Sequence, residues 1–339
     1  MVCEEGRVGC NADNVNPLET GWEGRINAMQ PKIVVIGSAN TDMIVRTTHI
    51  PKAGETVLGN EFIQSRGGKG ANQAVAAARL GAQVTFVARL GKDNLGQAAF
   101  AAYEEEQINT SYIVWDEAAP TGVALIMIDA DGENIICVAP GANARLSTGD
   151  ILKAEEAIRS ADCMLLQLEI PLDTVAYAIR LASKYHVRVV LNPAPMTSLS
   201  ENLLRMVDVL TPNETEAARL TGDELSHPRD LAYNVNRKYG VKNVIVTMGK
   251  EGALVSRLES PSPMLIPAFP VESVDATGAG DAFNGGLVVA LARGDALEEA
   301  VRYANAVGAL ATTRAGAQSC SPTAREVEAF LKKNAEKEN

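Results

Sequence analysis

The segment Asp275-Ala-Thr-Gly-Ala-Gly-Asp281 runs directly into the apolar stretch Ala282-Phe-Asn-Gly-Gly-Leu-Val-Val-Ala-Leu291. A loop of small residues that opens a helix exposes backbone N–H groups at the positive end of the helix dipole, and such groups bind anions. The carboxylate of Asp281 would repel an anion held there, so the pattern predicts a second role for it. A carboxylate that accepts a proton from a hydroxyl attacking the anion would fill that role, which indicates phosphoryl transfer.

Strand and helix patterns alternate along most of the chain. Buried strands are predicted at residues 33–37, 84–88, 163–168, 188–192, 207–210 and 244–247, and helices at 70–80, 96–106, 172–185 and 230–239. This alternation predicts an α/β fold of three layers, in which helices cover both faces of a mostly parallel central sheet.

Two regions, about 42–66 and 122–138, carry strand patterns without helices between them. The expected strands are at residues 43–46, 55–64, 123–128 and 134–138. The turn Asp129-Ala-Asp-Gly132 predicts a hairpin in the second region. We expect a small antiparallel sheet that stands off the main body and acts as a lid. The exposed edges of such a sheet need covering, and a second copy of the chain would cover them in a homodimer.

Composition excludes several classes of function. The chain has 339 residues and a net charge of −11, which argues against nucleic-acid binding. It has no run of the roughly 20 apolar residues that span a membrane. Five scattered cysteines without a C-x-x-C pair argue against a disulfide framework or a zinc site. The three histidines lie far from the glycine-rich loops, which disfavours histidine-based chemistry.

These features predict a soluble intracellular protein of the cytoplasm or an organelle stroma, including a plastid if a transit peptide has been removed. Residues 1–31 lack apolar periodicity, and we expect a disordered extension there. Residues 32–331 form the predicted domain, and residues 332–339 form a C-terminal tail.

Two polar segments near the N-terminus are candidate binding sites. Asn40 and Asp42 follow the first strand, where they could bind neighbouring hydroxyl groups or simply close an Asx turn. Arg66-Gly-Gly-Lys-Gly-Ala-Asn72 opens a helix and could bind a ligand through its backbone, Lys69 and Asn72, or could be an ordinary helix start. It is not a Walker A loop, because glycine follows Lys69.

Two later segments have equally plain alternatives. Asn213 and Glu216 match a capping box, and the same groups could organise Mg²⁺ through its water shell. The segment Thr247-Met-Gly-Lys-Glu-Gly252 predicts either a turn or hairpin, or a nucleotide contact. The opening segment also fails as a dinucleotide fingerprint, because Phe283 stands where the third glycine would be.

In this order, the five segments resemble the ribokinase family of carbohydrate kinases from about Lys32 to Leu331. The resemblance implies ATP-dependent phosphorylation of D-ribose at its 5-hydroxyl. Another sugar or nucleoside kinase, such as a fructokinase or adenosine kinase, is the alternative within the family. A sugar-binding regulator without catalysis is the alternative from another class.

The resemblance also implies roles for individual residues. Asp281 would be the catalytic base, and Gly278, Ala279 and Gly280 would form the anion hole. The positions for sugar binding are Asn40, Asp42, Gly68, Lys69, Asn72, Glu169 and Asp281. The positions for ATP, with its Mg²⁺, are Asn213, Glu216, Thr247, Gly249, Gly252, Gly280 and Asn305.

A monovalent cation, K⁺ in most members of the family, would bind beside the anion hole. Its predicted ligands, mostly backbone carbonyls, are at Asp275, Thr277, Ala311, Arg314, Gly316 and Cys320. Cys320 departs from the family pattern, which often has a hydroxyl-bearing residue at this position. A thiol is a poor ligand for a hard cation. Ser319, Ser321 or a water molecule would then have to take the place of the thiol as a ligand.

Overall fold

The computed structural model describes residues 30–223, 226–260 and 262–338. Two sheets hold the strands: β1 Lys32–Ile36, β2 Asn40–Arg46, β3 Glu61–Gly67, β4 Gln83–Gly91, β5 Asn109–Asp116, β6 Gly122–Ile128, β7 Asn134–Ala139, β8 Cys163–Leu166, β9 Arg188–Leu191, β10 Val209–Leu210, β11 Asn243–Thr247, β12 Gly252–Arg257 and β13 Met264–Pro267. The helices are α1 Lys69–Arg79, α2 Asn94–Glu105, α3 Thr148–Lys153, α4 Glu155–Arg159, α5 Leu172–Lys184, α6 Glu201–Leu204, α7 Glu214–Thr221, α8 Pro228–Tyr239, α9 Ala279–Ala292, α10 Leu297–Thr312 and α11 Ala324–Glu338, with short 3-10 helices η2 Gly141–Arg145 and η3 Gly249–Glu251.

The central sheet is mostly parallel, in the order β13-β12-β11-β10-β9-β8-β1-β4-β5. Only β12 and β13, at one edge, pair antiparallel. Strand order reverses beside β1, which pairs with β4 on one side and β8 on the other. Ligands of such sheets bind at the carboxyl ends of the strands next to this switch point.

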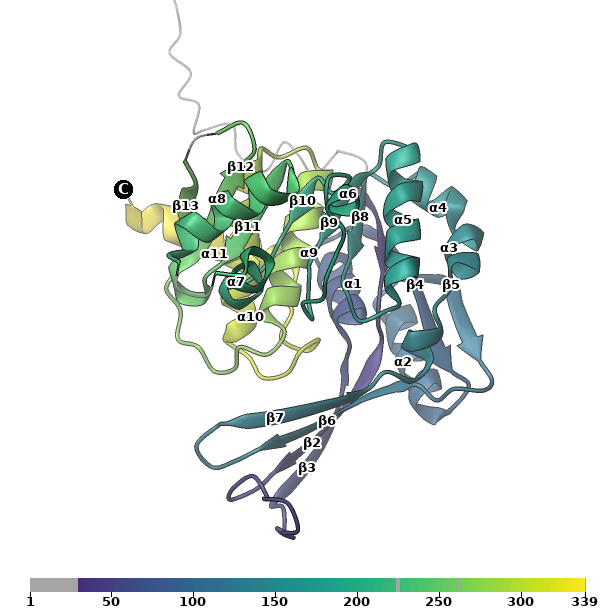
Figure 1. The fold of residues 1–339 in the computed structure, drawn as a ribbon. Helices are drawn as coiled ribbons and strands as arrows, with labels where there is room; N and C mark the ends of the chain where they lie inside the picture. Colours follow the sequence, from purple (N-terminus) through teal and green to yellow (C-terminus); the bar gives the residue numbers. More distant parts are fainter. Residues whose placement is uncertain (1–29, 224–225, 261, 339) are drawn as a thin grey trace, which may run out of the picture.

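Alternate side chains of the strands enter two separate hydrophobic cores. Ile33 and Val35 of β1 pack with α1, α2, α9, α10 and α11, whereas Val34 and Ile36 pack with the helices from α3 to α8. The near-continuous apolar strands follow from this burial on both faces. The predicted three-layer fold is therefore confirmed (Figure 1).

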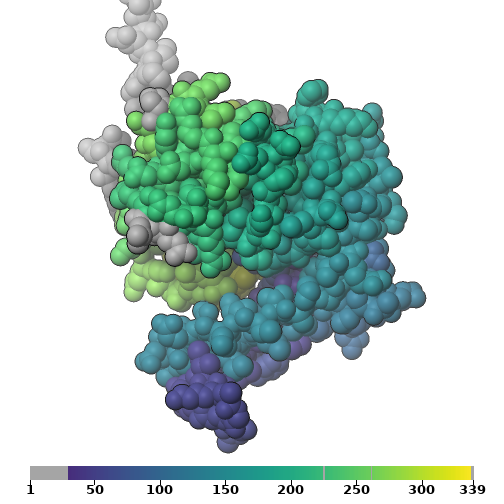
Figure 2. All heavy atoms as spheres, in the orientation of Figure 1, coloured from purple at the N-terminus to yellow at the C-terminus, as the bar shows by residue number. Residues whose placement is uncertain are grey.

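Four strands form the second sheet, in the order β3-β2-β6-β7. It projects from the body as a lid, and Figure 2 shows a hollow between the lid and the body. The β2–β3 and β6–β7 pairs are antiparallel, but the central β2–β6 pair is parallel, because both strands leave the body in the same direction.

One predicted strand was misplaced. The strand expected at residues 55–64 begins at Glu61 and continues to Gly67, since β3 must pair along the full length of β2 from Asn40 to Arg46. Strands β5, β12 and β13 were not predicted from the sequence.

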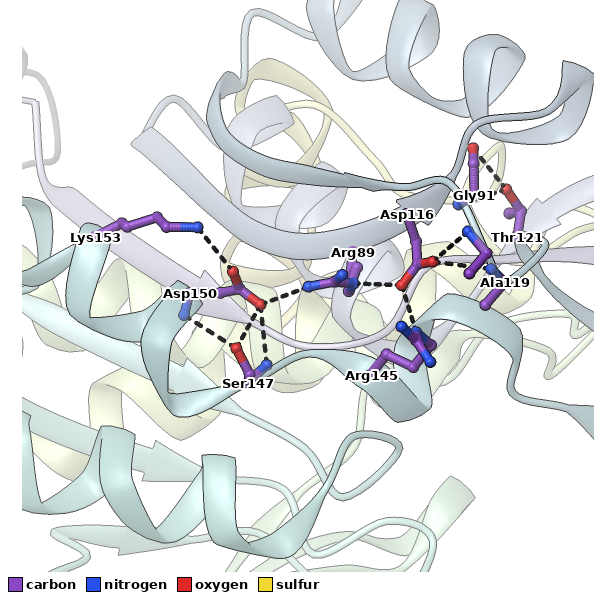
Figure 3. A network of polar contacts seen from close by, with 10 residues as sticks. Arg89, Gly91, Asp116, Ala119, Thr121, Arg145, Ser147, Asp150 and Lys153 are labelled. Atoms are coloured by element: carbon purple, nitrogen blue, oxygen red, sulfur yellow. Dashed lines mark hydrogen bonds and ion pairs between the residues drawn. The ribbon is translucent and has the colours of Figure 1, made fainter.

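A network of charged groups fastens the base of the β6–β7 hairpin (Figure 3). The carboxylate of Asp116, just before the hairpin, accepts hydrogen bonds from Arg89 Nε at 2.7 Å and Arg145 Nε at 2.6 Å. Arg89 also donates to Asp150 Oδ2 at 2.9 Å. The backbone N–H of Ala118 and these guanidinium groups hold the pKa of Asp116 well below its usual range. Both ends of the hairpin are thus tied to the body.

The chain termini concern two further predictions. Of the predicted extension at 1–31, all but the last two residues lie outside the described part, and Gln83 N donates to the carbonyl of Pro31 at 2.9 Å. Helix α11 runs through residues 332–338 of the predicted tail. In the described part of the chain, no helix is long and apolar enough to cross a membrane.

Candidate active site

The carboxyl ends of the central strands bring the predicted polar residues to one edge of the sheet. Asp281 lies in the first turn of α9, and only 7% of its surface is exposed. Asn72 Nδ2 donates to Asp281 Oδ2 at 2.9 Å, and Gln73 Nε2 donates to Asp281 Oδ1 at 2.9 Å. The carboxylate is therefore held from α1, more than 200 residues away in sequence. The side-chain oxygen of Asn72 is buried and has no hydrogen-bond partner, so its capacity to accept a bond is unused.

Two glycines allow the predicted sugar-binding residues to approach one another. A Cβ on Gly67 would lie 2.2 Å from Asp42 Oδ2, so the carboxylate of Asp42 occupies the space above this glycine. Gly68 has φ of 87°, and a Cβ there would lie 2.6 Å from the backbone nitrogen of Asn40. Gly68 therefore requires glycine, and a side chain at Gly67 would displace the Asp42 carboxylate. The two N-terminal segments therefore form one surface.

Glu169, after β8, completes this surface. It accepts a hydrogen bond from Lys69 N at 3.1 Å and a short one from the hydroxyl of Ser38. The charge of Asp281 raises the pKa of Lys69, so its ammonium stays protonated among the carboxylates. All seven predicted sugar-binding residues thus belong to one continuous polar site.

The carboxylate of Asp42 has a raised pKa. Burial, followed by the nearby charges of Glu169 and Asp281, raises its pKa from 3.8 to about 6, although Lys69 acts in the opposite direction. Asp42 is therefore largely ionised at neutral pH and becomes protonated as the pH falls through about 6.

This shift predicts a pH dependence. If sugar hydroxyls donate to ionised Asp42, kcat/KM for the sugar falls as the pH drops through about 6.

The same shift affects stability. Because the raised pKa destabilises the ionised form in the fold, the stability contributed by this group falls as pH rises from about 4 to 6. Asp42→Asn should therefore gain more in Tm relative to wild type at pH 7.5 than at pH 5. A wild-type kcat/KM that stays flat between pH 5 and 7.5 would contradict this role.

The predicted nucleotide residues are more scattered. Asn213 and Glu216 form the capping box of α7: Glu216 N donates to Asn213 Oδ1 at 2.8 Å, and Asn213 N donates to Glu216 Oε2 at 2.9 Å. Burial raises the pKa of Glu216. A β-bridge joins Asn213 to Thr247, which places both at the same sheet edge. Capping uses one carboxylate oxygen of Glu216 and leaves the other for the water shell of a Mg²⁺ ion.

The remaining nucleotide positions lie beyond this bridge. Gly249 begins η3 and Gly252 follows it, within a β11–β12 hairpin, so the hairpin alternative is confirmed. The side chain of Asn305 donates to the carbonyls of Ile266 and Pro267 at 3.0 and 3.1 Å. Its amide therefore fastens β13 to α10.

Asp275 joins the two loops of the predicted cation site. Its Oδ1 accepts from Thr277 N at 2.8 Å, and its Oδ2 accepts from Gly316 N at 3.0 Å. Although burial acts to raise the pKa of Asp275, these hydrogen bonds hold it below its usual value. The charge of Asp275 therefore lies between the loops that carry the predicted cation ligands. Ala311 and Arg314 lie at the end of α10, where the side chain of Arg314 pairs with Glu326.

Cys320 packs against the same loops. Its sulfur lies 3.7 Å from the carbonyl oxygen of Thr277 and 3.2 Å from that of Ala317. Burial raises the pKa of this thiol to about 11, so it is neutral and a poor ligand for K⁺. The part of the chain that the structure describes contains no cluster of three or more His, Cys, Asp or Glu residues suited to holding a metal ion.

Sequence reasoning missed several buried amides around the site. Asn143, after β7, donates to Asn40 Oδ1 at 2.7 Å and accepts from Ala39 N at 2.9 Å, which links the lid to the loop after β1. Gln73 and Gln167 are fully buried beside Asp281. The sequence offers no periodic signal for such residues, although Gln73 directly follows Asn72 in a segment already singled out.

The family model described as pfkB family carbohydrate kinase matches residues 30–324. The chain belongs to this family. The kinase is 42% identical over 305 residues to the ribokinase of Haemophilus influenzae, covering 89% of this chain and 99% of that protein. It is 38% identical over 306 residues to the deoxyribokinase of Salmonella typhi, covering 89% of this chain and 99% of that protein.

Solved structures place the kinase in the same fold. The structure of Arabidopsis thaliana ribokinase complexed with ribose and ATP superposes with a TM-score of 0.82 at 35% sequence identity, covering 90% of this chain and 99% of that one. The predicted family and fold class are thus confirmed.

Proposed function

We propose that this kinase transfers the γ-phosphoryl group of ATP to the 5-hydroxyl of D-ribose. The observation that carries the proposal is the position of Asp281, whose buried carboxylate is held by two amide donors beside the glycine-rich start of α9. The ribokinase relatives support ribose as the acceptor. The deoxyribokinase relative makes deoxyribose the second candidate.

The chemistry divides among groups of this site. Phosphoryl transfer needs positioning and charge neutralisation more than a strong base. Asn40, Asp42, Lys69, Asn72 and Glu169 would hold the sugar, so that its 5-hydroxyl lies against Asp281. Asp281 accepts the hydroxyl proton as the O–P bond forms and the bond to ADP breaks.

The anion hole would neutralise the migrating group. Gly278, Ala279 and Gly280 start α9, and their N–H groups lie at the positive end of its dipole. Asn213, Glu216, Thr247, Gly249, Gly252 and Asn305 would lie along the nucleotide. Mg²⁺, with Glu216 near its water shell, would supply further positive charge to the phosphates when bound.

A monovalent cation would order the loop from outside the sugar site. The carbonyls of Asp275, Thr277, Ala311, Arg314 and Gly316 would hold it, together with the Asp275 charge. Because Cys320 contributes a neutral thiol, we expect weaker selectivity for K⁺ over Na⁺ than a hydroxyl at this position would give.

A coupled ADP-release assay with ribose, deoxyribose, fructose and adenosine, each with K⁺ or Na⁺, tests the proposal. We expect turnover to be fastest with ribose, and faster with K⁺ than without it. Fastest turnover with fructose or adenosine would favour the other kinases. Absence of ADP release with every acceptor and either cation would favour a sugar-binding regulator.

We also propose that the lid forms a homodimer. The register places Phe62, Leu125 and Ile135 on the same face of the lid, opposite to Asp42, and each is at least half exposed. Such an apolar face on a projecting sheet favours association. We expect a dimer by light scattering at micromolar concentration and a monomer for Phe62→Ser combined with Leu125→Ser. A monomeric wild-type protein would contradict the proposal.

The remaining proposals concern organisation. We infer that residues 32–331 act as one catalytic domain, with lid strands within 42–66 and 122–138, and that residues 1–31 and 332–339 take no part in catalysis. A protein reduced to residues 30–339 should retain the wild-type kcat.

A further inference from the structure

The carboxylate of Asp281 is held by a residue that the roles above leave without a function. Gln73 lies on α1 with its side chain fully buried. Its Nε2 donates to Asp281 Oδ1 at 2.9 Å and to Asn192 Oδ1 at 3.2 Å. A fully buried glutamine is uncommon, because its polar amide must find partners for each donor and acceptor.

The amide of Gln73 can take only one orientation. Gln167 Nε2, just after β8, donates to Gln73 Oε1 at 2.5 Å. An ionised carboxylate only accepts hydrogen bonds, so the nitrogen of Gln73 must face Asp281. Asn192 in turn donates to the carbonyl of Thr211 at 3.0 Å, which also only accepts. The Asp281 carboxylate at one end of this series of hydrogen bonds and the Thr211 carbonyl at the other therefore require the same orientation of the Gln73 amide.

The same series of hydrogen bonds continues from Thr211 to α9, the helix that carries Asp281. The hydroxyl of Thr211 donates to Asn284 Oδ1 at 2.6 Å, and Asn284 Nδ2 donates to the carbonyl of Gly280 at 2.8 Å. The network thus links the ends of β8, β9 and β10 to the first turn of α9. It contains no charged group besides Asp281, and apart from Asp281 itself the partners of Gln73 are not assigned to the sugar or the nucleotide.

We propose that Gln73 is a positioning residue for the catalytic base, which sets the plane of the Asp281 carboxylate. Asn72 and Gln73 each donate to one oxygen, so together they prevent rotation of the carboxylate. Asn72 is also a predicted sugar-binding residue, whereas Gln73 is fully buried and has no such role. Gln73 therefore acts on the base without acting on substrate affinity. This inference rests on the proposed function of Asp281.

The variant Gln73→Met tests the inference, since methionine has a similar length and flexibility but no N–H donor. We expect kcat to fall about tenfold, the loss typical of one hydrogen bond to a charged group, with KM for ribose within about twofold of wild type.

Two matched variants separate positioning from packing. Gln167→Met keeps the bond from Gln73 to Asp281, so its kcat should stay within about threefold of wild type. The double variant Gln73→Met/Gln167→Met leaves no unpaired amide between the two positions, so its Tm should recover relative to Gln73→Met. Its kcat should remain as low as that of Gln73→Met. If the single variant does not fold, the double variant gives the kinetic result.

Three results would overturn the inference. A folded Gln73→Met protein with wild-type kcat would show that the donor is dispensable. An equal loss in Gln167→Met, or recovery of kcat in the double variant, would show a packing effect. Wild-type protein without kinase activity would instead contradict the proposed function, so the two failures are distinguishable.

Discussion

Replacement of Asp281 by asparagine is expected to lower kcat by at least about 100-fold, the usual range for loss of a general base. Asparagine keeps the size of the side chain but cannot take the proton of the sugar hydroxyl. Asn72 and Gln73 both donate hydrogen bonds to Asp281, and the amide N–H groups of an asparagine cannot accept such a bond. We therefore expect a small decrease in Tm. Steady-state kinetics with ribose measure kcat, and calorimetry measures sugar binding, which should survive.

The control is the same substitution at Asp230, an exposed residue in the first turn of α8. Asp230→Asn should leave kcat unchanged. Turnover near wild type in Asp281→Asn would show that Asp281 is not the base. Loss of sugar binding together with kcat would indicate that Asp281 mainly holds the substrate.

Gly278→Ala should damage both stability and turnover. Gly278 has φ of 76°, a left-handed conformation that costs an alanine about 1–2 kcal/mol. A Cβ there would also lie 2.6 Å from the carbonyl oxygen of Ala317. The start of α9 must shift to relieve this contact, which displaces the N–H groups of the anion hole. We expect a lower Tm and a decrease in kcat of about 100-fold, as for the loss of one oxyanion-hole donor.

Gly280→Ala is the matched control for the fold. A Cβ at Gly280 would meet no atom within 4 Å, and its φ is not left-handed, so Tm should not fall. Both variants are compared by thermal denaturation and by the ADP-release assay. Equal Tm values for Gly278→Ala and wild type would contradict the steric argument.

Much of the fold could be predicted from the sequence because its signals are local. The apolar runs that became β1, β4, β8, β9 and β11 predicted a parallel sheet, and the helix-free regions predicted the lid. The start of β3 could not be predicted, since its position depends on pairing with β2. The extended stretch before it carries a strand-like pattern but finds no partner strand.

Some residues of the site could likewise be predicted from the sequence, and others could not. Glycine-rich segments marked Lys69, Asn72 and Asp281, because the backbone conformation at a ligand limits the residue types there. Gln73, Asn143 and Gln167 gave no such signal, because their roles depend on partners about 100 or more residues away. The structure also shows that Asn213 and Glu216 do form the capping box, so the plain alternative is confirmed, and the magnesium role of the same residues stays a proposal.

The most direct test of the account is identification of the product. Purified protein is incubated with ATP, Mg²⁺, K⁺ and D-ribose, and the sugar phosphate is followed by ³¹P NMR together with ADP. We predict D-ribose 5-phosphate in a one-to-one ratio with ADP for the wild type, and none for Asp281→Asn over the same time. Phosphorylation at another hydroxyl, or ADP released with free phosphate and no sugar phosphate, would contradict the account.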